Sequence, residues 1–124
     1  MREHLYRGKE KGTGEWLYGS LIRVKHYQKD IVLFKIVPFE YFGDRSSEII
    51  PETVGQYTGL KDKNGVKIFE GDIVKTDFYD TPAVVDYSNG AFVTSGMFLT
   101  ETYDETMEVI GNIHDNPELL EGRT

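Results

Sequence analysis

The side chains of this 124-residue chain that could carry out chemistry are mainly carboxylates, because cysteine is absent and acidic residues are numerous. Asp72 with Asp77, and Asp80 with Asp86, form pairs that are close in sequence. Acid–base hydrolysis needs two carboxyl groups about 5–10 Å apart in a cleft, which sequence spacing alone does not establish. Such pairs arise by chance among 21 Asp and Glu residues. The two serines at residues 46–47 do not lie in the G-x-S-x-G elbow that presents a serine nucleophile. We therefore assign no catalytic residue and expect no enzymatic activity.

Metal ligands are equally sparse. His4, His26 and His114 are far apart, and none belongs to an H-x-x-x-H or H-E-x-x-H pair. Without cysteine, disulfides, thiolate catalysis and cysteine-type zinc sites are impossible. The acidic run 101–105 lacks the calcium-hand pattern and is typical of a solvated loop, with cation binding as the alternative. We expect no bound metal and no cofactor.

The glycine-rich stretch 53–75 is predicted to hold the middle of the chain as short strands joined by tight turns. Asn64-Gly65 predicts a primed hairpin turn, since both residue types tolerate positive φ. Asp62 can accept a hydrogen bond from the backbone two residues on. Residues 66–69 show the pattern of a half-buried strand, and Glu70-Gly71-Asp72 marks a second reversal. The stretch is predicted to be a compact β-meander.

The loop 59–63 also has a functional interpretation. Its backbone N–H groups and two lysines could hold a phosphate, but it has no G-x-x-x-x-G-K-[ST] pattern and no strand–loop–helix context. Glycine already serves the turn geometry there. A structural turn is our interpretation, and anion binding is the alternative.

Further strands are predicted on both sides of this stretch. Residues 1–14 are expected to be a surface segment with a turn at 12–14, and Asn89-Gly90 gives a second hairpin signal. Asn116 is expected to cap a brief helical turn with Pro117 at its first position. Many short strands with frequent turns are typical of a small barrel or sandwich. The remaining strand predictions cover residues 15–24, 30–37, 48–50, 73–78, 83–87, 91–94 and 108–113.

Several segments, in order along the chain, resemble the signatures of YopX-like proteins, which occur in bacteriophages and prophages. They are residues 16–21, 56–65, 68–74 and 109–120. The resemblance implies an all-β fold whose C-terminal part is an SH3-like small barrel with an uncharacterised role. It supplies no catalytic or binding residues. We expect an N-terminal β subdomain with a hinge loop at 1–52, packed on a barrel subdomain at 53–124, or else one continuous YopX-like domain.

The net charge of −7 is unevenly distributed. Residues 1–50 hold nine Lys and Arg against seven Asp and Glu, whereas residues 51–124 hold five against fourteen. A phosphate backbone is bound by clustered cations, which the acidic part does not offer. The asymmetry could draw the two parts together, within a chain or between subunits. A solvated acidic face that keeps the protein soluble is the alternative.

Eight tyrosines and seven phenylalanines are many for a small β-domain. Exposed aromatic side chains are typical of interfaces, where a ring buries much area at low entropic cost. Candidates are residues 41–42, Phe78-Tyr79 and Tyr103, with packing in the core as the alternative for each. Trp16 is interpreted as a core anchor, with ligand stacking as its alternative.

The leading hypothesis is a non-enzymatic phage or prophage accessory protein that acts through protein–protein contacts or as a homo-oligomer, with a phage or host protein as partner. The N-terminus has no apolar region and no run approaches the ~18 apolar residues of a membrane span, so we expect a cytoplasmic protein of the bacterial host. A hydrolase using acidic residues is the weakest hypothesis. The alternative is a nucleic-acid-binding small barrel, although the net charge opposes it. Its N-terminal cations would be Arg2, Arg7, Lys9, Lys11, Arg23, Lys25 and Lys29.

Overall fold

The protein is all-β, which confirms the predicted class. The computed structural model describes residues 5–25, 28–38, 46–79, 81–88, 90–94 and 97–121. These residues form antiparallel sheets with three short helical segments. Contacts divide the chain into two compact units, which we call unit 1 (residues 1–57) and unit 2 (residues 58–124). The sequence places a subdomain boundary after residue 52, and it stays a prediction because compactness does not test independent folding.

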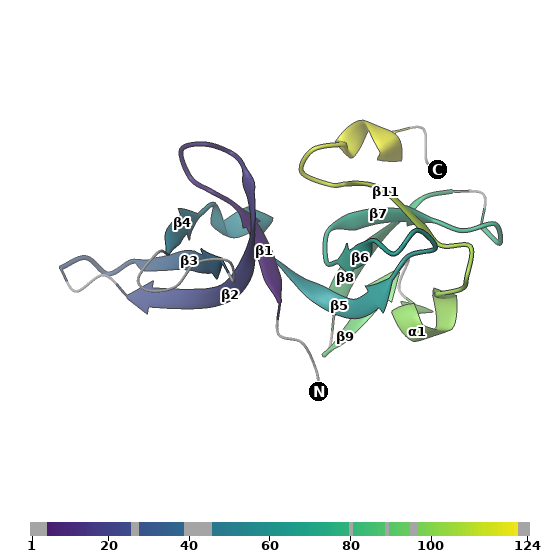
Figure 1. Cartoon of the computed structure of the whole chain (residues 1–124), viewed down its shortest axis with the longest axis horizontal. Helices are drawn as coiled ribbons and strands as arrows, with labels where there is room; N and C mark the ends of the chain where they lie inside the picture. The colour runs from purple at the N-terminus through teal and green to yellow at the C-terminus, as the bar shows by residue number, and fades with distance from the viewer. Residues whose placement is uncertain are drawn as a thin grey trace. The chain divides into compact units, whose positions relative to one another are not determined.

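Unit 1 is an antiparallel sheet in the order β4-β3-β2-β1, joined by the first residues of β5 (Figure 1). The long β2–β3 hairpin pairs in register from Gly19 with Pro38 to Lys25 with Val32. Strand β5 runs from unit 1 into unit 2, where it lies beside β6. The elements are β1 (Tyr6–Lys9), β2 (Trp16–Lys25), β3 (Val32–Pro38), β4 (Ser47–Ile49), the 3-10 helix η1 (Pro51–Thr53) and β5 (Gly55–Lys61).

Backbone hydrogen bonds hold β4 on both sides. On one side it pairs with β3, and on the other it meets the residues that follow β1. The Lys11 amide donates to the Glu48 carbonyl over 2.9 Å, and the Ile50 amide donates to the Lys9 carbonyl over 2.9 Å. The short β4 therefore does not present a free edge.

Two glycines let the strands of unit 1 approach closely. A Cβ atom at Gly8 would overlap the side chain of Ile49, which is buried together with Ile36. A Cβ atom at Gly19 would lie 2.7 Å from the carbonyl carbon of Val37 and would overlap its oxygen. Both glycines are therefore required by packing.

Unit 2 contains an antiparallel sheet in the order β10-β9-β8-β7-β11. Figure 1 labels β7, β8, β9 and β11. Its described strand pairings do not close into a barrel, so the SH3-like barrel of the sequence prediction is not confirmed. The elements are β6 (Lys67–Phe69), β7 (Asp72–Lys75), β8 (Ala83–Ser88), β9 (Ala91–Thr94), β10 (Met97–Phe98), α1 (Leu99–Thr102), β11 (Glu108–Asn112) and the 3-10 helix η2 (Pro117–Leu120).

The core of unit 2 gathers apolar side chains from five segments. Burying each such side chain contributes about 1.5–3 kcal/mol relative to leaving it exposed. Helix α1 contacts β9 and β10, so its Leu99 reaches this core. The buried members are Ile68, Val74, Val85, Leu99 and Met107.

The structure contains elements that the sequence pattern did not reveal. Strand β1 lies in the segment that the sequence predicts to be a surface segment. The prediction fails because Arg7 and Lys9 interrupt the apolar alternation, although Arg7 is buried in the structure. Helix α1 ends within the run 101–105, which was predicted as a loop. The turn at residues 12–14 and the short strand near residue 49 are confirmed.

The C-terminal helical turn is present, but Asn116 does not cap it. Pro117 occupies the first turn of η2 as predicted, and the Asn116 side chain makes no capping hydrogen bond. Its Oδ1 instead accepts from the Asn112 amide over 3.2 Å. A Cβ atom at Gly111 would lie 2.8 Å from Leu119 Cδ1, so the half-buried Leu119 packs where β11 lacks a side chain.

Within the described ranges, no helix has the length and hydrophobicity needed to cross a membrane.

Candidate functional site

The segment that follows β7 presents the most exposed aromatic side chain of the described residues. Phe78 is 77% exposed, and its neighbour Tyr79 is also exposed. The Phe78 amide donates to Thr76 Oγ1 over 3.2 Å, and the Asp77 amide donates to Thr106 Oγ1 over 2.9 Å. We call residues 76–79 the aromatic turn. These hydrogen bonds fix its backbone while leaving the Phe78 ring in solvent.

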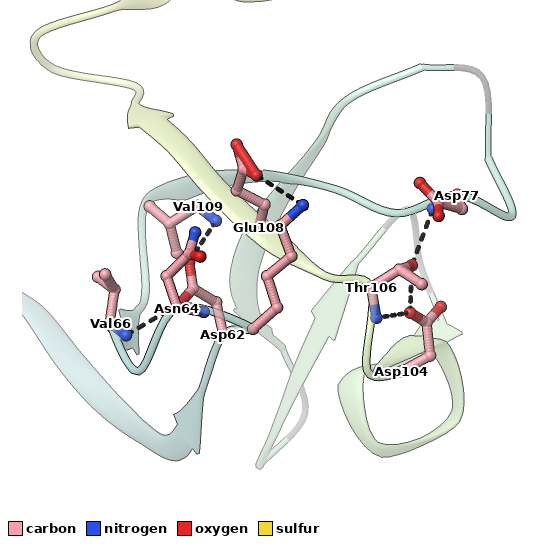
Figure 2. Close-up of polar contacts among 9 residues, drawn as sticks. Asp62, Asn64, Val66, Asp77, Asp104, Thr106, Glu108 and Val109 are labelled. Carbon is pink, nitrogen blue, oxygen red and sulfur yellow. Dashed lines mark hydrogen bonds and ion pairs between the residues drawn. The ribbon is translucent and has the colours of Figure 1, made fainter.

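Carboxylates border this turn. Figure 2 shows Asp77 and Asp104 on either side of Thr106. The Thr106 amide donates to Asp104 Oδ1 over 2.6 Å, and the Thr106 hydroxyl donates to the same oxygen. Thr106 thus links the aromatic turn to the segment after α1, and the turn carries the carboxylate of Asp77, the residue before Phe78.

A small pocket of about 70 Å³ lies beside Tyr79. Thr94 and Thr102 are part of the pocket lining, and their hydroxyls hydrogen-bond to each other. This bond gives both buried polar groups a partner. The volume is about half of the ~150 Å³ cavity that holds a benzene ring, so the pocket fits a short aliphatic group. Its lining is Val74, Lys75, Thr76, Tyr79, Thr81, Ala83, Thr94, Met97, Thr102 and Met107.

Strand β10 adds two exposed apolar side chains that the sequence analysis missed. Met97 pairs with Thr94 and lines the pocket, while Phe98 pairs with Val93 and is 54% exposed. A signal was available, because three consecutive apolar residues at 97–99 cannot all face one side of a strand.

The turn that joins β5 to β6 is connected to β11 by the carboxylate of Asp62, which is buried with 6% of its residue surface exposed. One oxygen accepts from the amides of Asn64 and Val66, each over 2.9 Å, and the other accepts from the Val109 amide over 2.9 Å (Figure 2). Burial raises the pKa of Asp62, but these three hydrogen bonds outweigh it and hold the pKa below its usual value. Asp62 is therefore an ionised anchor between the hairpin and β11.

The hairpin turn is centred one residue earlier than predicted. The Gly65 amide donates to the Asp62 carbonyl over 3.0 Å, so Lys63 and Asn64 are the central residues, and Gly65 follows with a φ of 80°. The predicted bond from Asp62 to the backbone two residues on is confirmed. The side chain of Asp62 also binds the Val66 amide, which selects this longer loop over a two-residue primed turn.

Phosphate binding at loop 59–63 conflicts with the hydrogen bonding. The Leu60 amide donates to Thr58 Oγ1 and the Lys63 amide to the Met107 carbonyl, so these donors already have partners. Lys63 Nζ lies 3.0 Å from Glu108 Oε2, which raises the pKa of Lys63 through a hydrogen bond and charge attraction.

The predicted aromatic candidates have different environments. Phe78 and Tyr79 are exposed, as the interface interpretation requires. Tyr103 packs against the core of unit 2, and its hydroxyl donates to the Lys61 carbonyl over 2.7 Å, so it is a packing residue. Residues 41–42 lie outside the described residues.

The carboxylates that were considered for hydrolysis have structural partners or exposed positions. Asp72 is buried and accepts from the Phe69 amide over 2.7 Å, and Asp86 is exposed in β8 and accepts from the Tyr87 amide. Asp80 lies outside the described residues. Ser47 hydrogen-bonds to Glu10, and this bond is the largest cause of a lowered Glu10 pKa.

The structure brings no metal-ligating set together among the described residues. The His114 amide donates to Asn112 Oδ1 in the turn after β11, whereas His4 and His26 lie outside the described residues.

The N-terminal cations proposed for nucleic acid lie on two faces of the unit 1 sheet. Arg7 and Lys9 lie over Trp16, with Arg7 Cζ at 4.7 Å and Lys9 Nζ at 5.5 Å from the ring centroid. From the strand register, Arg23 and Lys25 share the opposite face. Trp16 is half-buried, and these two cations contact its ring. Lys11 pairs with a carboxylate of β4, Lys29 is exposed in the hairpin connection, and Arg2 lies outside the described residues.

Comparisons with known proteins give a family and a fold. A family model described as YopX protein matches residues 5–121 of the chain. A solved structure, protein EF1440 from Enterococcus faecalis, is similar with a TM-score of 0.61 and 26% sequence identity, covering 98% of this chain and 100% of that chain. Among curated proteins, no match was found.

Proposed function

Because this chain belongs to the YopX protein family, we propose that it is a non-enzymatic protein that acts through protein–protein contacts and associates with itself. The phage or prophage setting and the cytoplasm of a bacterial host belong to this proposal, and they rest on the family resemblance. So does the SH3-like arrangement of residues 53–124, which the succession of short antiparallel strands in unit 2 supports.

The observation that carries the proposal is the exposure of Phe78 on a backbone fixed by hydrogen bonds. An aromatic ring in solvent contributes nothing to the core, but at an interface it buries large area while losing few rotamers. Tyr79, Met97 and Phe98 add exposed apolar surface in the same unit.

The roles of the buried carboxylates also favour a non-enzymatic function. Asp62 and Asp72 accept backbone N–H groups, and for Asp62 these bonds stabilise the ionised form. A general acid or base needs a pKa near the working pH, whereas the pKa of Asp62 is lowered. These side chains therefore suit structural anchoring.

Light scattering coupled to size-exclusion chromatography tests the proposal. We expect the mass of the wild-type protein to rise with concentration, and the double variant Phe78→Ser, Tyr79→Ser to remain monomeric. Val66→Ser is the matched control, because Val66 is an exposed apolar residue elsewhere in unit 2. A wild-type monomer at every concentration would contradict self-association.

Nucleic-acid binding remains the second candidate function, supported by the contact of Arg7 and Lys9 with an aromatic ring. The distribution of the cations over two faces weakens it. A gel shift with single-stranded DNA at about 50 mM salt, where backbone contacts are strong, is the test. Absence of binding there would remove this candidate.

A further inference from the structure

Unit 1 contains a mainly apolar hollow of about 170 Å³ beside strands β3 and β4, and its lining includes Val32, Phe34 and Ile49, which share one face of the sheet. This volume exceeds the ~150 Å³ of a cavity that holds a benzene ring, so a phenyl group fits. The lining is Lys11, Val32, Leu33, Phe34, Glu48, Ile49, Ile50 and Pro51. We call it the unit 1 hollow.

Cations border the unit 1 hollow. Lys25 lies directly opposite Val32 in the β2–β3 hairpin, and Arg23 lies opposite Phe34. Residues opposite each other in antiparallel strands share a face, so these two exposed cations stand beside the apolar lining. Lys11 and Glu48 also line the hollow, but their charges offset each other because the Lys11 ammonium lies 2.9 Å from the Glu48 carboxylate, so the net positive charge comes from Arg23 and Lys25.

The aromatic turn of unit 2 has the complementary chemistry. It presents the Phe78 ring, with the Asp77 and Asp104 carboxylates on either side of Thr106 (Figure 2). A phenyl group that follows an aspartate along the chain matches, in size and in sign of charge, a phenyl-sized hollow whose Val32 and Phe34 share a sheet face with two cations.

We propose that the aromatic turn of one copy binds the unit 1 hollow of a second copy, with the Phe78 ring among Val32, Phe34 and Ile49 and Asp77 facing Arg23 and Lys25. This inference rests on the proposed function, because it names the partner and the surface of that self-association. The contact joins two different surfaces, so it is heterologous and builds head-to-tail chains or rings.

Two variants that each remove one surface test the proposal. Phe78→Ser removes the ring, and Val32→Glu places a carboxylate in the hollow, where it repels Asp77 and can pair with Lys25 across the strands. Each variant alone should self-associate about tenfold or more weakly than wild type, as for the loss of an interface anchor. Circular dichroism checks that both are folded, and Lys61→Glu is the control for a charge change elsewhere.

The decisive sample is an equimolar mixture of the two variants, measured by analytical ultracentrifugation. One variant keeps the hollow and the other keeps the ring, so we expect a one-to-one heterodimer of wild-type affinity that does not grow further. If wild type self-associates but the mixture stays monomeric, or if Val32→Glu associates as strongly as wild type, this inference is wrong while the proposed function stands. A monomeric wild type would overturn both.

Discussion

Unit 1 and unit 2 are both built on antiparallel strand pairing, but different interactions supplement that pairing. In unit 1, backbone groups bond directly across the edge, as in the bond from Ile50 to Lys9, and glycine allows the close approach at Gly8 and Gly19. In unit 2, a buried side chain adds a connection, since the Asp62 carboxylate joins its hairpin to β11 alongside the backbone bond from the Lys63 amide to the Met107 carbonyl. Stability should therefore depend on steric fit in unit 1 and on ionisation in unit 2.

The two units also differ at the surface. Residues 58–124 hold five Lys and Arg against thirteen Asp and Glu, whereas residues 1–57 hold nine against eight. Phe78 and Phe98 are more exposed than any other large apolar side chain in the described residues, and both belong to unit 2. The comparison indicates that unit 2 presents rings within an acidic surface, while unit 1 presents a hollow with cations.

The largest expected effect comes from Asp62→Ala. The change leaves the amides of Asn64, Val66 and Val109 without their buried acceptor, which should cost about 3 kcal/mol of unfolding free energy. Hydrogen-exchange mass spectrometry should show the loss in peptides of unit 2 and little change in unit 1. The exposed Asp86→Ala is the control, and equal loss in both units would contradict the comparison.

Gly19→Ala is the converse experiment and should affect unit 1. A Cβ atom there overlaps the backbone of Val37, which cannot move without disturbing β3, so we expect a loss of about 2 kcal/mol. The fluorescence of Trp16, the single tryptophan, reports urea unfolding of unit 1. Ser20→Ala, one residue along and exposed, should leave the midpoint unchanged. A normal midpoint for Gly19→Ala would show that steric fit does not control unit 1.

Acid should weaken unit 2 through Asp62. The pKa of Asp62 is lowered in the folded state, so its contribution is complete above the unfolded value of about 3.9 and is lost as pH falls through the folded pKa. The stability difference between wild type and Asp62→Asn should therefore shrink below about pH 4. Urea midpoints from pH 7 downward measure it, and a difference independent of pH would rule out ionisation as the cause.

The smallest effect is expected for Lys63→Met. Its ammonium pairs with Glu108 at the surface, where such pairs contribute little. The pKa of Lys63 is raised, so what the pair contributes is present below the unfolded pKa and is lost as pH rises through the folded one. Thermal unfolding at pH 7 should be unchanged, and a large drop in Tm would mean that this ion pair also anchors unit 2.

Local patterns predicted much of the fold. The sequence predicts the long strands β2 and β3 and the segments around Gly65. These features depend on apolar alternation and glycine turns, which are encoded by neighbouring residues. Strand β1 could not be predicted from its own residues, because Arg7 is charged and its burial depends on contact with Trp16 in the next strand. The turn centred on Lys63 and Asn64 depends on the Asp62 carboxylate, which also binds the distant Val109 amide.

The candidate site could be predicted only in part. Phe78 and Tyr79 were identified by residue type, and their exposure is confirmed. Met97 and the unit 1 hollow were missed, because a hollow forms from strands β3 and β4 together with Lys11 from another part of the chain. Residue type alone does not separate Tyr103 from the exposed candidates, because its packing depends on the hydrogen bond from its hydroxyl to the Lys61 carbonyl, 42 residues earlier in the chain.

The most direct test of the contact between unlike surfaces is hydrogen exchange of the wild-type protein at low and high concentration. Slower exchange at high concentration is predicted in peptides covering residues 76–79 of unit 2 and in those covering 32–34 and 48–51 of unit 1. Peptides covering 15–22 serve as the internal reference and should not change. Protection of only one of the two surfaces, or exchange independent of concentration in all peptides, would contradict the account.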